Sequence, residues 1–179
     1  DGLQGITEAS SVRINRGPFL KTLTGLENLT KVKYLSVNRC DSLIDLSGLD
    51  ALEEVDDLLI YSNQSLTDIA GLRKLDTIFN DLSIHNNPVL KYFTGFRTKA
   101  ILGDVWLRNL PEVQDFSSLC CLDYVGGIFS VLESGLTSLA GLEGMKKIRG
   151  LHLGLNMDLE SLDGLDNLRE LNFLTLFNN

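Results

Sequence analysis

The stretch that decides the fold is residues 141–165, GLEGMKKIRGLHLGLNMDLESLDGL, in which a Gly-Leu pair returns after 23 residues. The same pair recurs along the chain at spacings of 23 or 24 residues, and Gly95-Phe96 and Ser118-Leu119 replace it in the middle. The pairs are Gly2-Leu3, Gly25-Leu26, Gly48-Leu49, Gly71-Leu72, Gly141-Leu142 and Gly164-Leu165. A fixed period of this length indicates a repeat protein, in which each repeat is one unit of a stack.

Apolar residues hold fixed positions within the period, and this predicts a continuous core. Counted from the glycine, positions two, eight, nineteen and twenty-two are apolar in every complete repeat. In the repeat that begins at Gly95, position eight is Leu102, whereas Lys99 and Ala100 stand where other repeats have Leu or Met. The core residues predicted for one coil are Leu58, Ile60, Leu66, Ile69 and Leu72.

A pair of apolar residues with period two follows position eight, and this alternation predicts a short, half-buried strand. The pairs are Val12/Ile14, Leu35/Val37, Leu58/Ile60, Leu82/Ile84, Val105/Leu107, Leu151/Leu153 and Leu174/Leu176. Phe129/Val131 complete the set if Gly126-Gly127 carries the same one-residue insertion as Phe79-Asn80-Asp81. Each repeat is therefore expected to form one coil, with a strand, a turn near Asn63, Asn86 or Asn156, and two further apolar segments. Stacking such coils at about 4.8 Å gives a rod of roughly 37 Å.

The pattern resembles the receptor L-domain family over essentially the whole chain. The resemblance is carried by Leu159-Glu-Ser-Leu162-Asp-Gly164-Leu165-Asp-Asn-Leu168, which follows Ile148-Arg-Gly150-Leu151-His-Leu153-Gly-Leu-Asn156, and by the turns Asn63-Gln-Ser-Leu66 and Asn156-Met-Asp-Leu159. These turns place Leu three residues after Asn, where ordinary leucine-rich repeats place it two residues after. The resemblance implies a mainly β, right-handed, leucine-rich-repeat-like solenoid of about eight 23-residue coils. It also implies a ligand-binding role at a cell surface, as in insulin-type and epidermal-growth-factor-type receptors and in surface proteins of fungi, protists and bacteria.

This chain is more regular than the L domains of animal receptors and lacks their disulfide caps, which favours a microbial or protist relative. Ordinary leucine-rich-repeat proteins are the nearest alternative family.

Composition and charge limit the classes of partner. The 179 residues are 44% apolar and 22% charged, which is typical of one folded domain spanning 1–179. The net charge of −8 disfavours nucleic acid and anionic lipid as partners. The apolar run Tyr124–Leu132 is much shorter than the ~20 residues of a membrane-spanning helix. Because neither end carries a polar capping element, we expect a segment of a longer solenoid, or open ends that contact another chain.

The cysteines and the two glycosylation sequons give weaker indications. Cys40 is predicted to lie four coils, or about 19 Å, from Cys120 and Cys121, well beyond the ~7 Å that a disulfide can span between Cα atoms. The candidate glycosylation sites are Asn28, in Asn-Leu-Thr, and Asn63, in Asn-Gln-Ser. Asn28 is the better candidate, since it should point outward. At Asn63 a glycan would compete with turn hydrogen bonds of the side chain.

No arrangement of residues in the sequence indicates catalysis. His85 and His152 are predicted to lie three coils apart, too far for a shared metal, and no phosphate-binding loop or nucleophile elbow is present. We therefore expect a non-enzymatic protein without a cofactor or a metal. Asp45, Asp68 and Asp115 share one turn position, where we expect them to bond their own backbone. A calcium-binding ladder, as in a calcium-dependent adhesin, is the alternative.

The side chains that alternate with the strand core positions are predicted to form an exposed face rich in aromatic residues. Exposed Tyr, Trp and Arg are typical of binding surfaces, although aromatic residues also favour strands whatever they face. The predicted partner-binding residues are Tyr34, Tyr61, His85, Trp106, Arg108, His152 and Phe173. The predicted function is that of an extracellular or cell-surface module that recognises a protein or glycan. The alternatives are an intracellular leucine-rich-repeat scaffold and a structural subunit that assembles through its open ends.

Overall fold

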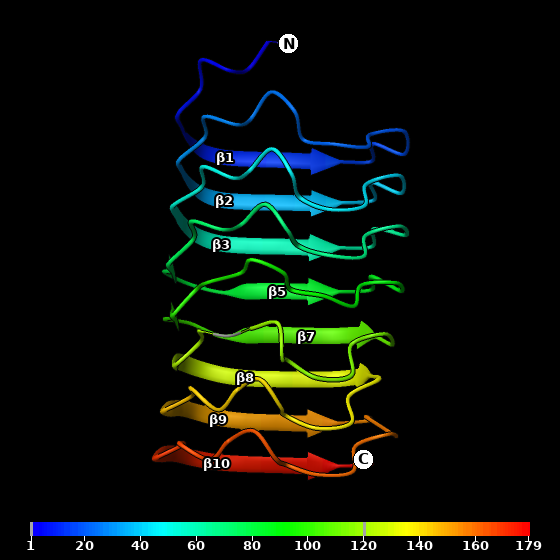
Figure 1. Ribbon diagram of the computed structural model, residues 1–179, viewed down its shortest axis with the longest axis vertical. Helices are drawn as coiled ribbons and strands as arrows, with labels where there is room; N and C mark the ends of the chain where they lie inside the picture. Colours follow the sequence, from blue (N-terminus) through cyan, green and yellow to red (C-terminus); the bar gives the residue numbers. More distant parts are fainter. Residues whose placement is uncertain (1, 120) are drawn as a thin grey trace.

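The chain forms a parallel β-solenoid, a rod of stacked strands with the two ends of the chain at opposite ends of the rod (Figure 1). The computed structural model describes residues 2–119 and 121–179, and within these ranges it has ten strands in one parallel sheet and no helix. The strands are β1 Glu8–Asn15, β2 Lys31–Asn38, β3 Glu54–Tyr61, β4 Thr77–Ile78, β5 Leu82–His85, β6 Ala100–Ile101, β7 Val105–Leu110, β8 Tyr124–Ser134, β9 Lys147–Gly154 and β10 Glu170–Phe177.

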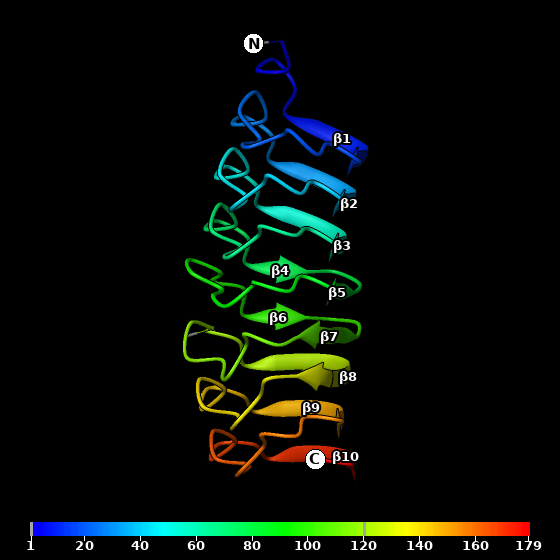
Figure 2. The same cartoon turned by 90° about the vertical axis from the view of Figure 1, so that its right-hand side faces the viewer.

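The number of coils is slightly smaller than the sequence predicts. β4 and β5 share one level of the rod, and so do β6 and β7, because each pair occupies two halves of one strand position. The ten described strands therefore occupy eight levels, one for each predicted strand. About seven coils join these eight levels. The sheet lies along one side of the rod, and the turns lie opposite (Figure 2).

Strand register confirms the predicted period and core. Leu35 pairs with Leu58, 23 residues later, and Val32 pairs in the same way with Val55. The five core residues predicted for one coil are all fully buried: Leu58, Ile60, Leu66, Ile69 and Leu72. Equivalent leucine, isoleucine, valine and phenylalanine side chains above and below them extend this core along the rod. A single coil could not bury these side chains, so its stability comes from its neighbours.

The predicted one-residue insertion is present and produces a bulge within the strand level. Val125 pairs with Ile148, whereas Phe129 pairs with Leu151, and the register shifts between Val125 and Ile128. The insertion at Gly126-Gly127 is therefore confirmed, and Phe129 and Val131 are both buried as predicted.

The prediction of Leu102 as a core residue is wrong. Ile101 pairs with Ile78 and is fully buried, whereas the Leu102 side chain is 48% exposed. The corner that begins at Gly95 is one residue shorter than the others, so Thr98 takes the buried position that Leu75 holds in the preceding coil. The Thr98 hydroxyl donates a hydrogen bond of 2.9 Å to the Leu75 carbonyl, which satisfies this buried polar group.

Aspartates and glycines stabilise the bulged levels. The Asp81 carboxylate accepts a hydrogen bond of 2.7 Å from the Asp104 backbone N–H, and the Asp104 carboxylate accepts one of 2.7 Å from the Ile128 N–H. A Cβ atom at Gly103 would lie 2.2 Å from an Asp81 carboxylate oxygen, and one at Gly127 would lie 2.0 Å from an Asp104 oxygen. Each carboxylate therefore occupies the space that glycine leaves in the next coil.

A left-handed residue ends every strand level. These residues have φ between 52° and 58° and are Arg16, Arg39, Ser62, Asn86, Asn109, Glu133, Leu155 and Asn178. The following residue points into the rod, and in several coils it is asparagine. Asn87 therefore holds the ladder position, and Asn86 is the left-handed residue before it, which corrects the turn position predicted from the sequence.

The buried asparagines connect neighbouring turns by hydrogen bonds. The Asn63 side chain accepts a bond of 3.0 Å from the Cys40 N–H and donates one of 3.2 Å to the Val37 carbonyl. Asn87 accepts a bond of 3.0 Å from the Asn63 N–H in the same way. These side chains satisfy backbone groups that the turn removes from the sheet, inside an otherwise apolar core.

The first prediction concerns the stacked core. Replacing Leu66 with alanine should lower the free energy of unfolding by about 2–5 kcal/mol, because the cavity cannot be filled from coils that are fixed above and below it. Equilibrium unfolding in guanidinium chloride measures the change, with the exposed neighbour Thr67→Ala as control. Equal effects of the two substitutions would contradict the assigned core.

The second prediction compares the two sequon asparagines. Asn63→Ala should destabilise the fold by about 2–4 kcal/mol, because a buried N–H and a buried carbonyl lose their partner. Asn28 is exposed, so Asn28→Ala should cost less than about 1 kcal/mol. Thermal and chemical unfolding of the unglycosylated proteins would measure both, and similar losses would argue against the asparagine ladder.

Candidate partner-binding face

The candidate site is the outward face of the sheet, which we define by three columns of side chains that alternate with the core. The first column is Ser11, Tyr34, Asp57, Asp81, Asp104, Ile128, Gly150 and Phe173; the second is Arg13, Ser36, Leu59, Ser83, Trp106, Ser130, His152 and Thr175; the third is Asn15, Asn38, Tyr61, His85, Arg108, Leu132, Gly154 and Phe177. Successive members of a column lie on adjacent levels, about 4.8 Å apart.

All seven predicted partner-binding residues lie on this face, but not as one cluster. Tyr61, His85 and Arg108 are consecutive in the third column, and Trp106 lies beside Arg108 on the same strand. The others are spread toward the two ends of the rod: Tyr34, His152 and Phe173. The middle of the face is therefore the part where the predicted residues come together.

The second column alternates between large and small side chains along the rod. Arg13, Leu59, Trp106 and His152 are separated by serines, and Thr175 follows His152. Trp106 is 37% exposed, and in the described part of the chain its side chain makes no hydrogen bond and no ring contact. Part of the Trp106 side chain is thus accessible on this face.

Planar side chains in the third column stack on one another. The Tyr61 and His85 rings lie 4.9 Å apart between centroids with an angle of 11°. Burial lowers the pKa of His85, and the Arg108 charge lowers the pKa further, so the imidazole is neutral at neutral pH. The Arg108 guanidinium forms an ion pair of 2.7 Å with Glu133 and is otherwise well exposed.

Two phenylalanine rings near the last level are held by glycines of β9. A Cβ atom at Gly150 would lie 2.0 Å from the Phe173 ring, and one at Gly154 would lie 2.2 Å from the Phe177 ring. His152 lies between these glycines, 5.2 Å from the Phe177 ring centroid. Phe173 therefore has a structural role as well as 42% exposure. The sequence shows this arrangement in two stretches: residues 150–154 read GLHLG, and residues 173–177, 23 positions later, read FLTLF. Each glycine of the first stretch thus aligns with a phenylalanine of the second.

The acidic residues of the first column were not predicted as part of the face. Asp57 and Asp81 lie on adjacent levels, and Asp57 accepts a bond of 3.4 Å from the Asp81 N–H. Each aspartate of this column uses one oxygen for the backbone of the next coil, which leaves a half-exposed negative charge. No sequence pattern indicated this arrangement, because the insertion interrupts the alternation of the strands.

The turn aspartates bond their own backbone, as predicted. The Asp45 carboxylate accepts a bond of 2.8 Å from the Ser47 N–H, and Asp115 accepts one of 2.9 Å from the Ser117 N–H. Within residues 2–119 and 121–179, no group of three or more His, Cys, Asp or Glu side chains is placed to hold a metal. In the same residues, no helix is long and apolar enough to cross a membrane.

The sequon and cysteine predictions have different outcomes. Asn63 is fully buried and its amide nitrogen is hydrogen-bonded, so a glycan at Asn63 is incompatible with this fold. Glycosylation of the exposed Asn28 stays a prediction. Cys40 carries a free, buried thiol, in agreement with the predicted absence of a long-range bridge, and burial raises its pKa. Cys120 lies outside the described residues.

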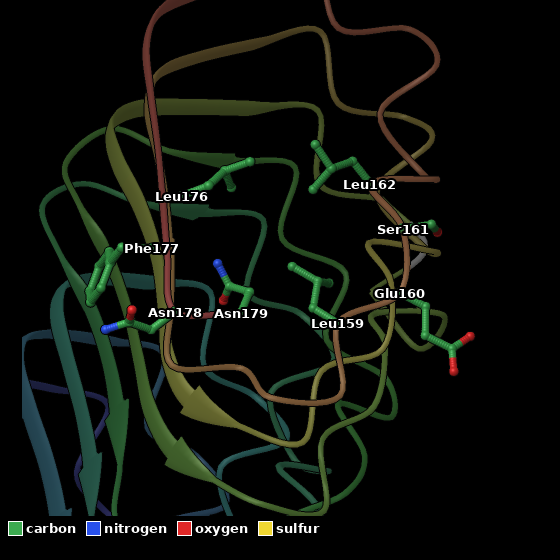
Figure 3. Close-up of a pocket in the computed structure, with 8 residues that line it drawn as sticks. All are labelled: Leu159, Glu160, Ser161, Leu162, Leu176, Phe177, Asn178 and Asn179. Carbon is green, nitrogen blue, oxygen red and sulfur yellow. The ribbon is translucent and has the colours of Figure 1, made fainter.

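A shallow hollow of about 350 Å³ lies at the C-terminal end of the rod. Leu159, Leu162 and Leu176 line it, with Asn179 between them (Figure 3). These three leucines occupy the core positions of the last coil, at the end of the stack. The hollow therefore belongs to the core of the solenoid rather than to a separate cleft.

No protein-family model matches the chain, and comparisons with curated proteins and with solved structures found no match either.

A third prediction tests how the phenylalanine rings are held. Gly150→Ala should destabilise the protein by about 1–3 kcal/mol, because the new methyl group displaces the Phe173 ring. In a Phe173→Ala background the same substitution should be neutral within about 0.5 kcal/mol, since the two effects are coupled. Gly144→Ala is the control, because its Cβ would meet only the Leu122 carbonyl oxygen at 3.6 Å. Additive effects at 150 and 173 would contradict the contact.

Proposed function

We propose that this chain is a non-catalytic recognition module that binds a protein or glycan partner through its outward face, at a cell surface or outside the cell. The observation that carries the proposal is Trp106. It is the single tryptophan of the chain, it stands exposed between Ser83 and Ser130, and the core is filled without it. A large aromatic residue that is partly exposed, has small neighbours in its column and makes no side-chain hydrogen bond or ring contact in the described residues is typical of an interface hot spot.

The surroundings of Trp106 support the same proposal. The Arg108 guanidinium and the Asp104 carboxylate lie on the same level, so charged groups of both signs flank an aromatic centre. Stacked Tyr61 and His85 rings continue this surface on the neighbouring levels. An apolar centre with a polar margin is typical of surfaces that bind proteins. A sugar is a second suitable ligand, because its apolar ring face can pack on an aromatic ring while its hydroxyl groups bond to carboxylates.

We further propose that the solenoid is right-handed and of the receptor L-domain kind. Leucine-rich repeats have Asn or Cys at the turn that follows the strand. Here Cys40, Asn63, Asn87 and Asn156 hold this position, and each asparagine bonds the backbone of a neighbouring coil. The three-residue gap from Asn63 to Leu66 and the left-handed glycine corners add to the likeness.

The fourth prediction tests the recognition role. Trp106→Ala should weaken partner binding about 30-fold or more, which corresponds to roughly 2 kcal/mol. The free energy of unfolding of the Trp106→Ala protein should change little, because the indole ring does not fill the core. Labelled protein at nanomolar concentration would be applied to a glycan array and to intact cells with and without protease treatment. Gln114→Ala, an exposed residue outside the outward face, is the control. A Trp106→Ala protein that keeps every interaction but loses stability would show that the residue is structural.

A further inference from the structure

The first and third columns of the outward face match in chemistry, level by level. In the middle of the rod each acidic residue of the first column shares its level with an aromatic, neutral imidazole or cationic group of the third. These same-level pairs are Asp57/Tyr61, Asp81/His85 and Asp104/Arg108, and the apolar pairs Ile128/Leu132 and Phe173/Phe177 follow toward the C-terminal end. The members of a pair are four residues apart, about 13 Å along the strand, so they do not contact each other within one chain.

From this pattern we infer that the outward face binds a second copy of this chain, with the two rods parallel and related by a two-fold axis parallel to the rod. The inference rests on the proposed function in that it uses the same face. This operation keeps every level opposite the same level and exchanges the first column with the third. Asp104 then faces Arg108 of the second copy, Asp81 faces His85, and Asp57 faces the Tyr61 hydroxyl. Opposite charges and hydrogen-bonding groups meet at each of these levels.

The charges discriminate between the two face-to-face symmetries. A two-fold axis parallel to the strands would reverse the order of the levels and keep each column opposite itself. If this axis passed between the β5 and β7 levels, Asp81 would face Asp104 across the interface, and the Arg108 charge would face the neutral His85 instead of a carboxylate. Like charges in direct opposition are strongly unfavourable, so only the axis parallel to the rod gives a complementary surface.

The second column lies on the proposed axis, where each side chain meets its own copy. Leu59 and Trp106 meet as apolar pairs, and the serines between them leave room for the larger groups. Arg13 is the one charged residue of this column, and its guanidinium lies over the Tyr34 ring, 4.9 Å from the ring centroid. This ring contact draws the Arg13 charge to one side of the axis.

The size of the face is sufficient for a weak, specific dimer. Seven spacings of about 4.8 Å by five residues of about 3.3 Å give roughly 550 Å² per copy. The total of about 1,100 Å² exceeds the ~1,000 Å² that a specific interface needs and falls in the size range of weak, transient contacts. Sheets that pack face to face lie about 10 Å apart, which side chains of this size can fill.

The fifth prediction tests this dimer in the wild-type protein. Sedimentation equilibrium at low salt should show a monomer–dimer equilibrium below about 100 μM, and the emission of Trp106 should shift to shorter wavelength as the dimer forms. Trp106 is the only tryptophan, so its emission reports this face alone. A monomeric mass up to about 100 μM, or a dimer whose formation leaves the Trp106 emission unchanged, overturns the inference.

Charge reversal then tests the pairing. Arg108→Asp should weaken the dimer at least about 10-fold, because the introduced carboxylate would face Asp104, and Asp104→Arg/Arg108→Asp should restore it to within about threefold. Arg97→Asp, at an exposed residue outside the face, is the matched control and should have no effect. Asp104 holds the Ile128 N–H and Arg108 pairs with Glu133 of its own chain, so the single and the double variant are both first checked by their thermal melting. If it does not fold, the Trp106 emission and the Arg108→Asp variant decide.

The two proposals fail separately. A protein that stays monomeric but loses glycan or cell binding on Trp106→Ala excludes only the dimer. A dimer that depends on Arg108, without any other Trp106-dependent binding, supports the inference and contradicts the proposal that the face binds a different protein or a glycan. An Arg108→Asp dimer as strong as the wild type overturns the pairing.

Discussion

The parallel hydrogen-bond ladder between successive strands is the constraint on which the rest of this structure depends. It places residues 23 positions apart about 4.8 Å from each other, so every position must suit its own neighbour above and below. Leucine on leucine satisfies this in the core, and asparagine on asparagine satisfies it at the turn, where Asn63 bonds Asn87. Glycine satisfies it at the corner: a Cβ at Gly48 would lie 2.4 Å from the Leu23 carbonyl oxygen of the preceding coil. The regular sequence follows from this contact between coils.

An inserted residue disturbs the ladder, and the way it is accommodated shapes the candidate binding surface. In the bulged levels a backbone N–H loses its strand partner, and an aspartate of the adjacent coil accepts its hydrogen bond. Glycines at 103 and 127 make room for the carboxylates. The same aspartates give the first column its negative charge, opposite a third column that contains Arg108. The electrostatic character of the face is thus a consequence of how the backbone is repaired.

The sequence was sufficient to predict the period, the strands, the core of a regular coil and the outward position of Trp106, because each of these repeats several times. It failed where two irregularities cancel. The corner after Gly95 lacks one residue and the strand after Ile101 gains one, so the spacing from Gly95 to Ser118 stays at 23 and Leu102 is misplaced. The contact of Phe173 with Gly150 escaped prediction for another reason: it joins neighbouring strands on the exposed face, where no apolar periodicity reports it.

The three columns of the outward face differ in how far their side chains can change without disturbing the coil. The first is committed to the backbone through Asp81 and Asp104 and to the ring contact at Gly150. The third is partly committed through the Tyr61–His85 stack and the Arg108–Glu133 ion pair. Within the described residues, the side chains of Leu59 and Trp106 in the second column make no hydrogen bond, ion pair or ring contact. Substitutions at these two positions therefore change the side chains exposed on the face without changing the coil. A column with large residues on alternate levels, and serines between them, can therefore change the chemistry of the outward face while the strand ladder beneath it stays intact.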